Sequence, residues 1–158
     1  MAMRFWLAPH LAFLLQWLRI LGFEVRLWRK GMPGWDAEDA IIQWNRYPLP
    51  VRGVRIISLG STTREGLLKE LFSSLSWVPD RTRMFKRCLR CNSRLMPLNP
   101  EQAFLKWPKI PPYVLQTQER FNWCDPCRKL YWAGTHVEHM IKSLEDWGVI
   151  PRSPSNPL

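Results

Sequence analysis

The four cysteines of the 158-residue chain form two short pairs, Cys88-Leu-Arg-Cys91 and Cys124-Asp-Pro-Cys127. A Cys-x-x-Cys turn directs both of its sulfurs at one metal ion, and zinc binds four thiolates at about 2.3 Å. The spacer between the pairs, residues 92–123, is long for a zinc finger but ordinary for a zinc ribbon. The spacing therefore predicts one zinc ion per chain, held by Cys88, Cys91, Cys124 and Cys127.

This zinc would be structural, because four thiolates leave no open position for water or substrate. Its binding free energy would fold a segment too small to fold alone. Two alternatives are a pair of structural disulfides and a redox Cys-x-x-Cys motif. Disulfides require an oxidising compartment, and a redox motif needs no second pair. His136, downstream of the second pair, could also replace one cysteine as a ligand.

The first twenty residues superficially resemble a secretory signal, because an apolar stretch follows Arg4. However, His10, Gln16 and Arg19 interrupt that stretch, and no small-residue cleavage pattern precedes Gly22. No apolar run reaches the ~18 residues of a membrane-spanning helix. We therefore expect a cytoplasmic protein, in a reducing compartment, without a transmembrane segment.

The formal net charge of the chain is +10 at pH 7. A four-thiolate zinc centre contributes −2, which would leave +8 in the metal-bound form. A charge of this size indicates a polyanionic partner, most often nucleic acid, although solubility alone or an anionic membrane surface are alternatives. The ten tryptophans could stack on bases. Because they are spread from Trp6 to Trp147, most are expected in the hydrophobic core.

The first half of the chain, residues 1–80, shows alternating strand and helix patterns. The expected elements are a strand over 4–8, a helix over 11–21, a strand over 24–28, a helix over 36–44, a strand over 54–59 and a helix over 61–72. Gly22 would end the first helix in a left-handed conformation, and Asp36 would cap the second. This order implies a small, mostly parallel sheet flanked by helices.

The second half changes character near Asp80 and fits a zinc ribbon over residues 81–150. It contains a Pro-rich stretch with one short helix over 100–106, a return strand over 129–132 and a last helix from Thr135 to Trp147. Residues 151–158 form a polar, Pro-rich tail that we expect to be disordered.

Four segments together resemble a known family. They are 14–25 (Leu-Leu-Gln-Trp-Leu-Arg-Ile-Leu-Gly-Phe-Glu-Val), 87–92 (Arg-Cys-Leu-Arg-Cys-Asn), the second cysteine pair, and 131–136 (Tyr-Trp-Ala-Gly-Thr-His). They resemble the PIN-like RNase family with a C-terminal zinc ribbon, the mutator-seven C-terminal RNase domain. The resemblance extends from about Arg4 to Trp147. It implies a reduced PIN-like parallel sheet flanked by helices, followed by a zinc ribbon and a C-terminal helix.

The resemblance also implies RNA cleavage by metal ions that a cluster of carboxylates holds at the strand ends. This chain departs from that pattern. Ala8 stands where the first strand of the family ends in Asp, and the Thr-Arg-Asp segment of a central strand is missing, unless Ser61 takes that position. Asp36, Glu38 and Asp39 match an acidic patch of the family. Helix capping explains them as well, and better, because a metal cluster without strand-end partners would bind weakly.

The sequence thus predicts a degenerate member of the family with no catalytic residues, in which Asp36 and Asp39 are the remaining weak candidates. RNA, or an RNA–protein complex, would be bound through the basic residues of the ribbon, Arg87, Arg90, Arg94 and Arg128. One alternative is a residual ribonuclease that uses Asp36 and Asp39 with a distant carboxylate such as Glu65. The other is a structural subunit whose Trp-rich face docks onto protein subunits of a larger assembly.

Overall fold

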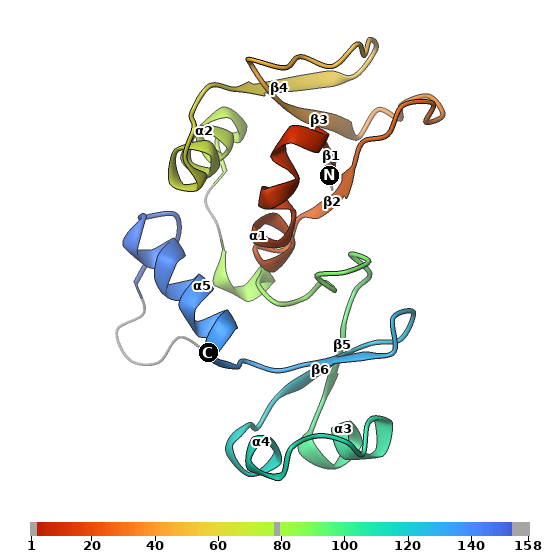
Figure 1. The fold of residues 1–158 in the computed structure, drawn as a ribbon, viewed down its shortest axis with the longest axis vertical. Helices are drawn as coiled ribbons and strands as arrows, with labels where there is room; N and C mark the ends of the chain where they lie inside the picture. Colours follow the sequence, from red (N-terminus) through yellow and green to blue (C-terminus); the bar gives the residue numbers. More distant parts are fainter. Residues whose placement is uncertain (1–2, 78–79, 153–158) are drawn as a thin grey trace.

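The computed structural model describes residues 3–77 and 80–152, in a lobe built on a parallel sheet and a smaller ribbon lobe (Figure 1). The parallel sheet contains β1 (Arg4–Leu7), β2 (Glu24–Leu27), β3 (Asp39–Trp44) and β4 (Arg55–Leu59) in the order β2-β1-β3-β4. All three pairings are parallel. The carboxyl ends of the four strands therefore lie along one edge of the sheet, and their amino ends along the opposite edge.

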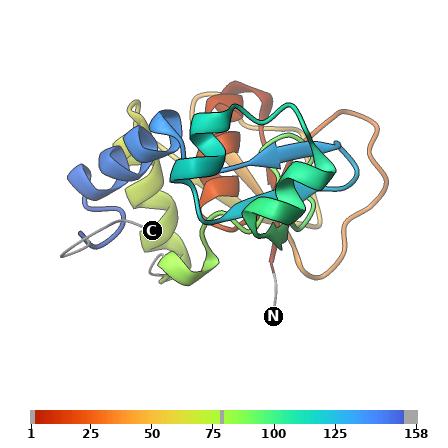
Figure 2. The same cartoon turned by 90° about the horizontal axis from the view of Figure 1, so that it is seen from below.

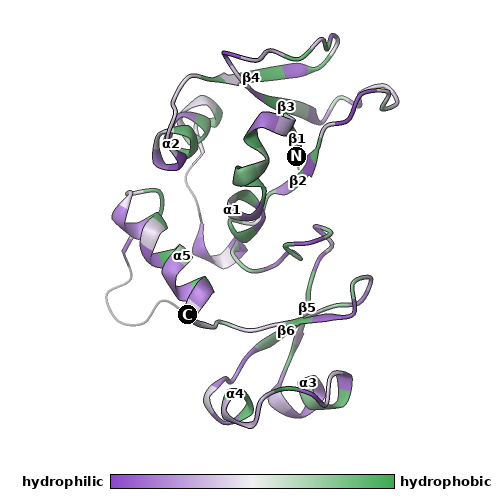
Figure 3. Cartoon of the chain, viewed as in Figure 1, coloured by the Kyte–Doolittle hydropathy of each residue, from purple (hydrophilic) through white to green (hydrophobic). Residues whose placement is uncertain are grey.

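Two helical segments flank this sheet, as the sequence predicted. The 3₁₀ segment η1 (Pro9–Leu14) leads into α1 (Leu15–Ile20), and α2 spans Arg64–Leu75. Leucines at helical spacing bury one face of the first segment; they are Leu11, Leu14, Leu18 and Leu21. Thr63 begins α2, because its side-chain oxygen accepts a hydrogen bond from the Gly66 N–H. Figure 3 shows the hydrophobic residues along α1 and β3.

The prediction of a helix over 36–44 is wrong, because Asp39–Trp44 forms β3, a central strand of the sheet. Residues 40–43 are buried on both faces of the strand, between β1 and β4. Strands of parallel sheets read as short continuous apolar runs, and such runs also fit a helical spacing. The chain therefore passes from β2 to β3 and from β3 to β4 without an intervening helix.

The ribbon lobe is an antiparallel sheet of β5 (Met96–Leu98), β6 (Phe121–Cys124) and β7 (Lys129–Tyr131), in that order. Two short helices cover it, α3 (Pro100–Lys106) and α4 (Pro112–Thr117), as the view from below shows (Figure 2). Asn99 and Gln102 form a reciprocal capping box at the start of α3. A small separate core fills this lobe, with Phe121 and Trp123 at its centre.

The last helix, α5 (Thr135–Asp146), packs on the first lobe although it follows the ribbon in sequence (Figure 1). Met140, Ile141 and Leu144 join the core that β1, α1 and α2 also build. The boundary expected at residue 80 therefore divides the sequence into two parts, but α5 from the second part packs into the core of the first lobe. Of the expected disordered tail, residues 153–158 lie outside the described part. No helix in the described ranges is both long enough and apolar enough to span a bilayer.

Gly22 ends α1 with φ +96°, as predicted, and also lies against the segment that leads to the ribbon. A Cβ at this position would lie 2.5 Å from the carbonyl oxygen of Arg83. Gly53, with φ +75°, has no neighbouring atom within 4 Å of such a Cβ. Gly53→Ala should therefore cost only the backbone strain of about 1–2 kcal/mol.

Gly22→Ala should cost about 2–5 kcal/mol, because overpacking against backbone adds to the same strain. Urea denaturation of the two variants measures the difference in unfolding free energy. Equal losses would contradict the close approach of Gly22 to Arg83.

Candidate metal centre and nucleic-acid interface

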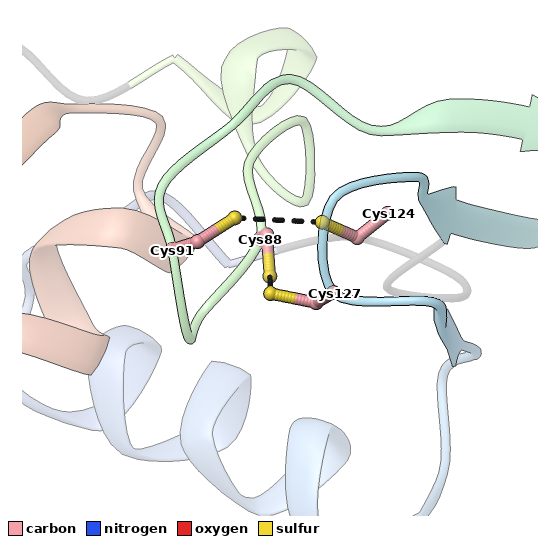
Figure 4. Close-up of side chains that lie close together, drawn as sticks. All are labelled: Cys88, Cys91, Cys124 and Cys127. Carbon is pink, nitrogen blue, oxygen red and sulfur yellow. Dashed lines mark hydrogen bonds between the residues drawn. The ribbon is translucent and has the colours of Figure 1, made fainter.

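The four cysteines converge between the two lobes, with their sulfurs facing one another (Figure 4). All four Sγ atoms lie within 4.8 Å of one another; the Cys91–Cys124 separation is 3.5 Å and the Cys88–Cys127 separation 3.9 Å. A tetrahedral centre with metal–sulfur bonds of about 2.3 Å requires sulfurs about 3.8 Å apart. The sulfur positions therefore fit one tetrahedral metal ion, and none of the four is in a disulfide.

The backbone after each pair has the same left-handed turn. Asn92 follows Cys91 with φ 68°, and Arg128 follows Cys127 with φ 52°. The Asn92 N–H donates to the Cys88 carbonyl at 2.9 Å, and the Arg90 N–H points at the Cys88 sulfur at 3.4 Å. N–H groups directed at sulfur stabilise a thiolate. The two turns thus present their sulfurs as ligands from opposite sides.

The thiols of this site cannot all ionise without a countercharge. Burial disfavours the thiolate of Cys91, but hydrogen bonding with the Ser93 hydroxyl and N–H outweighs it and lowers the pKa of Cys91 to about 6. Burial and the neighbouring sulfurs raise the pKa of Cys124 instead. A bound cation would remove this conflict by stabilising all four thiolates together.

The first cysteine pair is fastened to the parallel sheet by two buried side chains. The Arg19 guanidinium, from α1, donates to the carbonyls of Val25, Leu89 and Arg90 at 2.8–3.2 Å. The Asn92 amide, oriented to satisfy both partners, donates to the Phe23 carbonyl and accepts from the Val25 N–H, each at 3.1 Å. These contacts cover the free edge of β2 and join the metal centre to the first lobe.

His136 is exposed at the start of α5 and is not part of the group of converging ligand atoms. Within residues 3–77 and 80–152, the four cysteines are the one group of three or more His, Cys, Asp or Glu side chains that could hold a metal ion.

The sequence analysis did not identify the left-handed turns at Asn92 and Arg128. The signal that could have predicted these turns is the position of each residue, directly after a Cys-x-x-Cys pair.

Asp36 and Asp39 lie at the amino-terminal edge of the sheet, beside the start of β1. Asp39 is buried, its carboxylate 3.1 Å from Arg4 Nε, and it accepts hydrogen bonds from Trp6 Nε1 and the Asp36 N–H. Asp36 forms an ion pair with the same arginine. Hydrogen bonding to Asp36 is the main reason that the pKa of Arg4 is raised. Both carboxylates therefore already have a cationic partner.

The carboxyl-terminal edge is where ligands of parallel sheets usually bind. The residues that follow β1, β2, β3 and β4 there are Ala8, Trp28, Asn45 and Gly60, none of them acidic. The helix α2 carries two carboxylates near this edge, and both have partners of their own. Glu70 accepts from the N–H groups of Gly60 and Ser61, and Glu65 forms an ion pair with Lys69.

The four arginines expected to bind RNA are only partly brought together. Arg87 and Arg94 pair across an antiparallel bridge and line the same pocket. Arg90 is exposed on the first cysteine turn, and its carbonyl accepts from Arg19. Arg128 is exposed on the second turn, 5.7 Å above the Trp123 ring and 3.5 Å from the Asp125 carboxylate. The pocket also contains Arg55, Arg83 and Lys86, which sequence reasoning did not name as binding residues.

Comparison with known proteins identifies a family. The Mut7-C RNase domain family matches residues 3–144. No curated protein and no solved structure gives a match. The matched range includes the whole parallel sheet, both cysteine pairs and most of α5. The chain therefore belongs to the Mut7-C RNase domain family.

Proposed function

We propose that this protein is a zinc-containing, RNA-binding member of its family that does not cleave RNA. The observation that carries the proposal is a contrast between two surfaces. The carboxyl edge of the sheet has no acidic strand ends, whereas cationic side chains gather beside the first cysteine pair. The four reduced thiols favour zinc as the ion, and they also fit the reducing cytoplasm.

The loss of catalysis follows from which residues end the central strands. β3 ends with Gln43-Trp44 and is followed by Asn45, so the residue after this central strand offers an amide and no carboxylate. Ala8 is fully buried at the end of β1 and offers only a methyl group. Hard divalent cations need oxygen ligands, with carboxylates to neutralise their charge. This edge therefore supplies no acidic ligand from a strand end.

A residual ribonuclease that uses Asp36, Asp39 and Glu65 is disfavoured, because Glu65 lies far from the two aspartates. Asp39 begins β3 at the amino edge, whereas Glu65 lies in the first turn of α2, just after the carboxyl end of β4. The five residue steps of β3 alone span about 16 Å. Two catalytic metal ions lie about 3.5–4 Å apart and share their ligands. These carboxylates cannot serve one such centre.

Purified protein supplied with Mg²⁺ or Mn²⁺ should not cleave single-stranded or structured RNA above the background rate. The physical reason is the missing carboxylates at the strand ends, and gel analysis of end-labelled RNA is the measurement. Asp36→Asn is the informative variant, because Asp36 is exposed. A cleavage activity that this substitution abolishes would show that the amino-edge carboxylates are catalytic after all.

RNA binding should be strong at low salt and weaken steeply as salt rises. Each phosphate contact on a single strand releases counterions and contributes a log–log slope of about −0.7. Contacts from Arg87, Arg90, Arg94 and Arg128 together would contribute about −3 to this slope. Fluorescence anisotropy over a salt series measures it. A slope near zero, or no binding at low salt, would refute the RNA-binding function.

A docking function is the second candidate, and one observation favours it. The ribbon helices expose large apolar side chains, with Leu105 80% exposed, Tyr113 69% and Phe104 47%. Such a surface is typical of protein contacts. RNA binding and docking to protein subunits would be compatible in an RNA–protein complex. Purification from cells with identification of both RNA and protein distinguishes the two functions.

A further inference from the structure

A pocket of about 570 Å³ opens where the first lobe meets the segment that leads to the metal centre. One wall is the amino-terminal edge of the sheet, from Phe5 of β1, Glu24 of β2 and Arg55 of β4. The facing wall comes from the end of α2 and from residues 82–94. The volume is within the range of about 300–1,000 Å³ that small-ligand pockets occupy. The pocket lies at the opposite edge of the sheet from Ala8 and Asn45.

The pocket is strongly cationic. Five of its lining residues are basic and one is acidic, which gives a formal charge of +4; the basic residues are Arg55, Arg83, Lys86, Arg87 and Arg94. Within the described residues, none of these five forms an ion pair with a carboxylate. Several cations that converge on a concave surface without carboxylate partners form a site for a polyanion. Glu24, the single acid, can accept hydrogen bonds from hydroxyl or amino groups of a ligand.

Three aromatic rings form part of the remaining lining, which also includes Met3, Gly22, Leu75 and Thr82. Phe5, Phe23 and Trp77 contribute to the pocket, and Phe23 contacts both others, with ring centroids 5.4 Å apart for Phe5–Phe23 and 4.5 Å for Phe23–Trp77. Phe23 and Trp77 are only partly buried. Aromatic faces beside cations provide what a nucleotide requires, because its base stacks and its phosphate needs positive charge.

The metal centre positions part of the cationic wall. Arg87 immediately precedes the ligand Cys88, and its guanidinium donates to the Asn92 carbonyl at 3.1 Å. The Leu95 N–H donates to the Lys86 carbonyl at 2.9 Å, which holds together the segments before and after the first cysteine turn. Arg94 faces Arg87 across the bridge between them. The turn that presents two of the sulfurs thus also sets the positions of three cations.

From this arrangement we propose that the pocket holds one nucleotide of a single-stranded RNA, with the base against Trp77 and Phe23 and the adjoining phosphates against Arg83, Lys86 and Arg94. This inference rests on the RNA-binding function proposed above and assigns its site. Single strands are required because a paired base is stacked inside its helix and cannot enter a concave pocket. The aromatic wall gives no base specificity, because every base has a π face.

The test measures the binding of a labelled single-stranded RNA of about ten nucleotides, close to the site size of single-strand-binding domains. Arg83→Gln/Lys86→Gln/Arg94→Gln should lower the affinity and flatten the salt slope by about two units, because three phosphate contacts are lost. Trp77→Leu should weaken binding by about 5- to 100-fold with an unchanged slope, because it removes one stacking face and no charge. The matched control is Arg52→Gln/Lys109→Gln/Lys142→Gln, which removes three exposed charges outside the pocket and should bind as the wild type does.

Zinc content and thermal melting are measured for every variant, so that a folding defect in Trp77→Leu is separated from a binding defect. If Trp77→Leu does not fold, the charge variants still test the proposal. If the control triple loses as much affinity as the pocket triple, the pocket assignment is overturned while RNA binding stands. Equal affinity for duplex RNA overturns the single-strand assignment. If excess free mononucleotide displaces the strand completely, the pocket is a site for a free nucleotide and the strand assignment is overturned. Absence of wild-type binding at low salt refutes the RNA-binding function and this inference together.

Discussion

Cys91→Ser should abolish the metal site and unfold the ribbon lobe while the parallel sheet remains folded. Structural zinc contributes roughly 10–16 kcal/mol of apparent binding free energy in zinc-finger peptides, and the ribbon has only a small core of its own to replace it. The first lobe has a larger core, which α5 helps to build. Hydrogen exchange should therefore become fast in β5, β6 and β7 and stay slow in β1 and β3.

Elemental analysis of the native protein should give one zinc per chain, and a chelator should reproduce the effect of Cys91→Ser. Zinc affinity should also fall as the pH falls, because protons compete with the metal for four thiolates. His136→Ala is the matched control, because this exposed histidine lies outside the sulfur cluster and its loss should leave the zinc in place. Two disulfides in the mass spectrum, or loss of zinc in His136→Ala, would contradict the four-cysteine centre.

The parts of the fold that the sequence predicts correctly have a local chemical signature. The cysteine spacing leads to the metal centre because each pair forms its own turn, whatever the rest of the chain does. The leucine spacing from Leu11 to Leu21 identifies the first helical segment, and Gly22 marks its end. The strand predicted over 54–59, which the structure has at Arg55–Leu59, and the last helix are identified in the same way.

The parts that it does not predict depend on contacts between distant segments. Asp39–Trp44 is a strand because β1 and β4 enclose it, and its apolar run alone fits a helix equally well. The helix α5 follows the ribbon but packs on the first lobe, which no local pattern indicates. The cationic pocket draws its residues from several separate segments. Arg83 and Lys86 therefore join Arg55 in one pocket only after the chain has folded.

Arg19 offers the sharpest test of how the two lobes are joined. Its guanidinium is buried, with 5% of the residue exposed, and it donates to the carbonyls of Val25, Leu89 and Arg90. Burial lowers the pKa of Arg19, and the neighbouring sulfurs of the first cysteine pair oppose that shift. A zinc ion with four thiolates carries a net charge of −2, so this buried arginine would also be a countercharge to it.

Arg19→Met should lower the free energy of unfolding by about 3–5 kcal/mol, because three carbonyl groups lose their buried donor and the methionine replaces only the aliphatic part of the arginine side chain. It should also weaken zinc binding, since the countercharge is lost. Arg19→Lys should restore little, because a single ammonium cannot reproduce the planar fork that reaches three carbonyls. Arg26→Met, on the exposed side of β2, is the matched control and should change stability by less than about 0.5 kcal/mol. Urea denaturation and a zinc competition assay measure the two effects. If Arg19→Met matches the control in both assays, then the first cysteine turn does not depend on α1 for its position, and the two lobes are joined chiefly by the packing of α5.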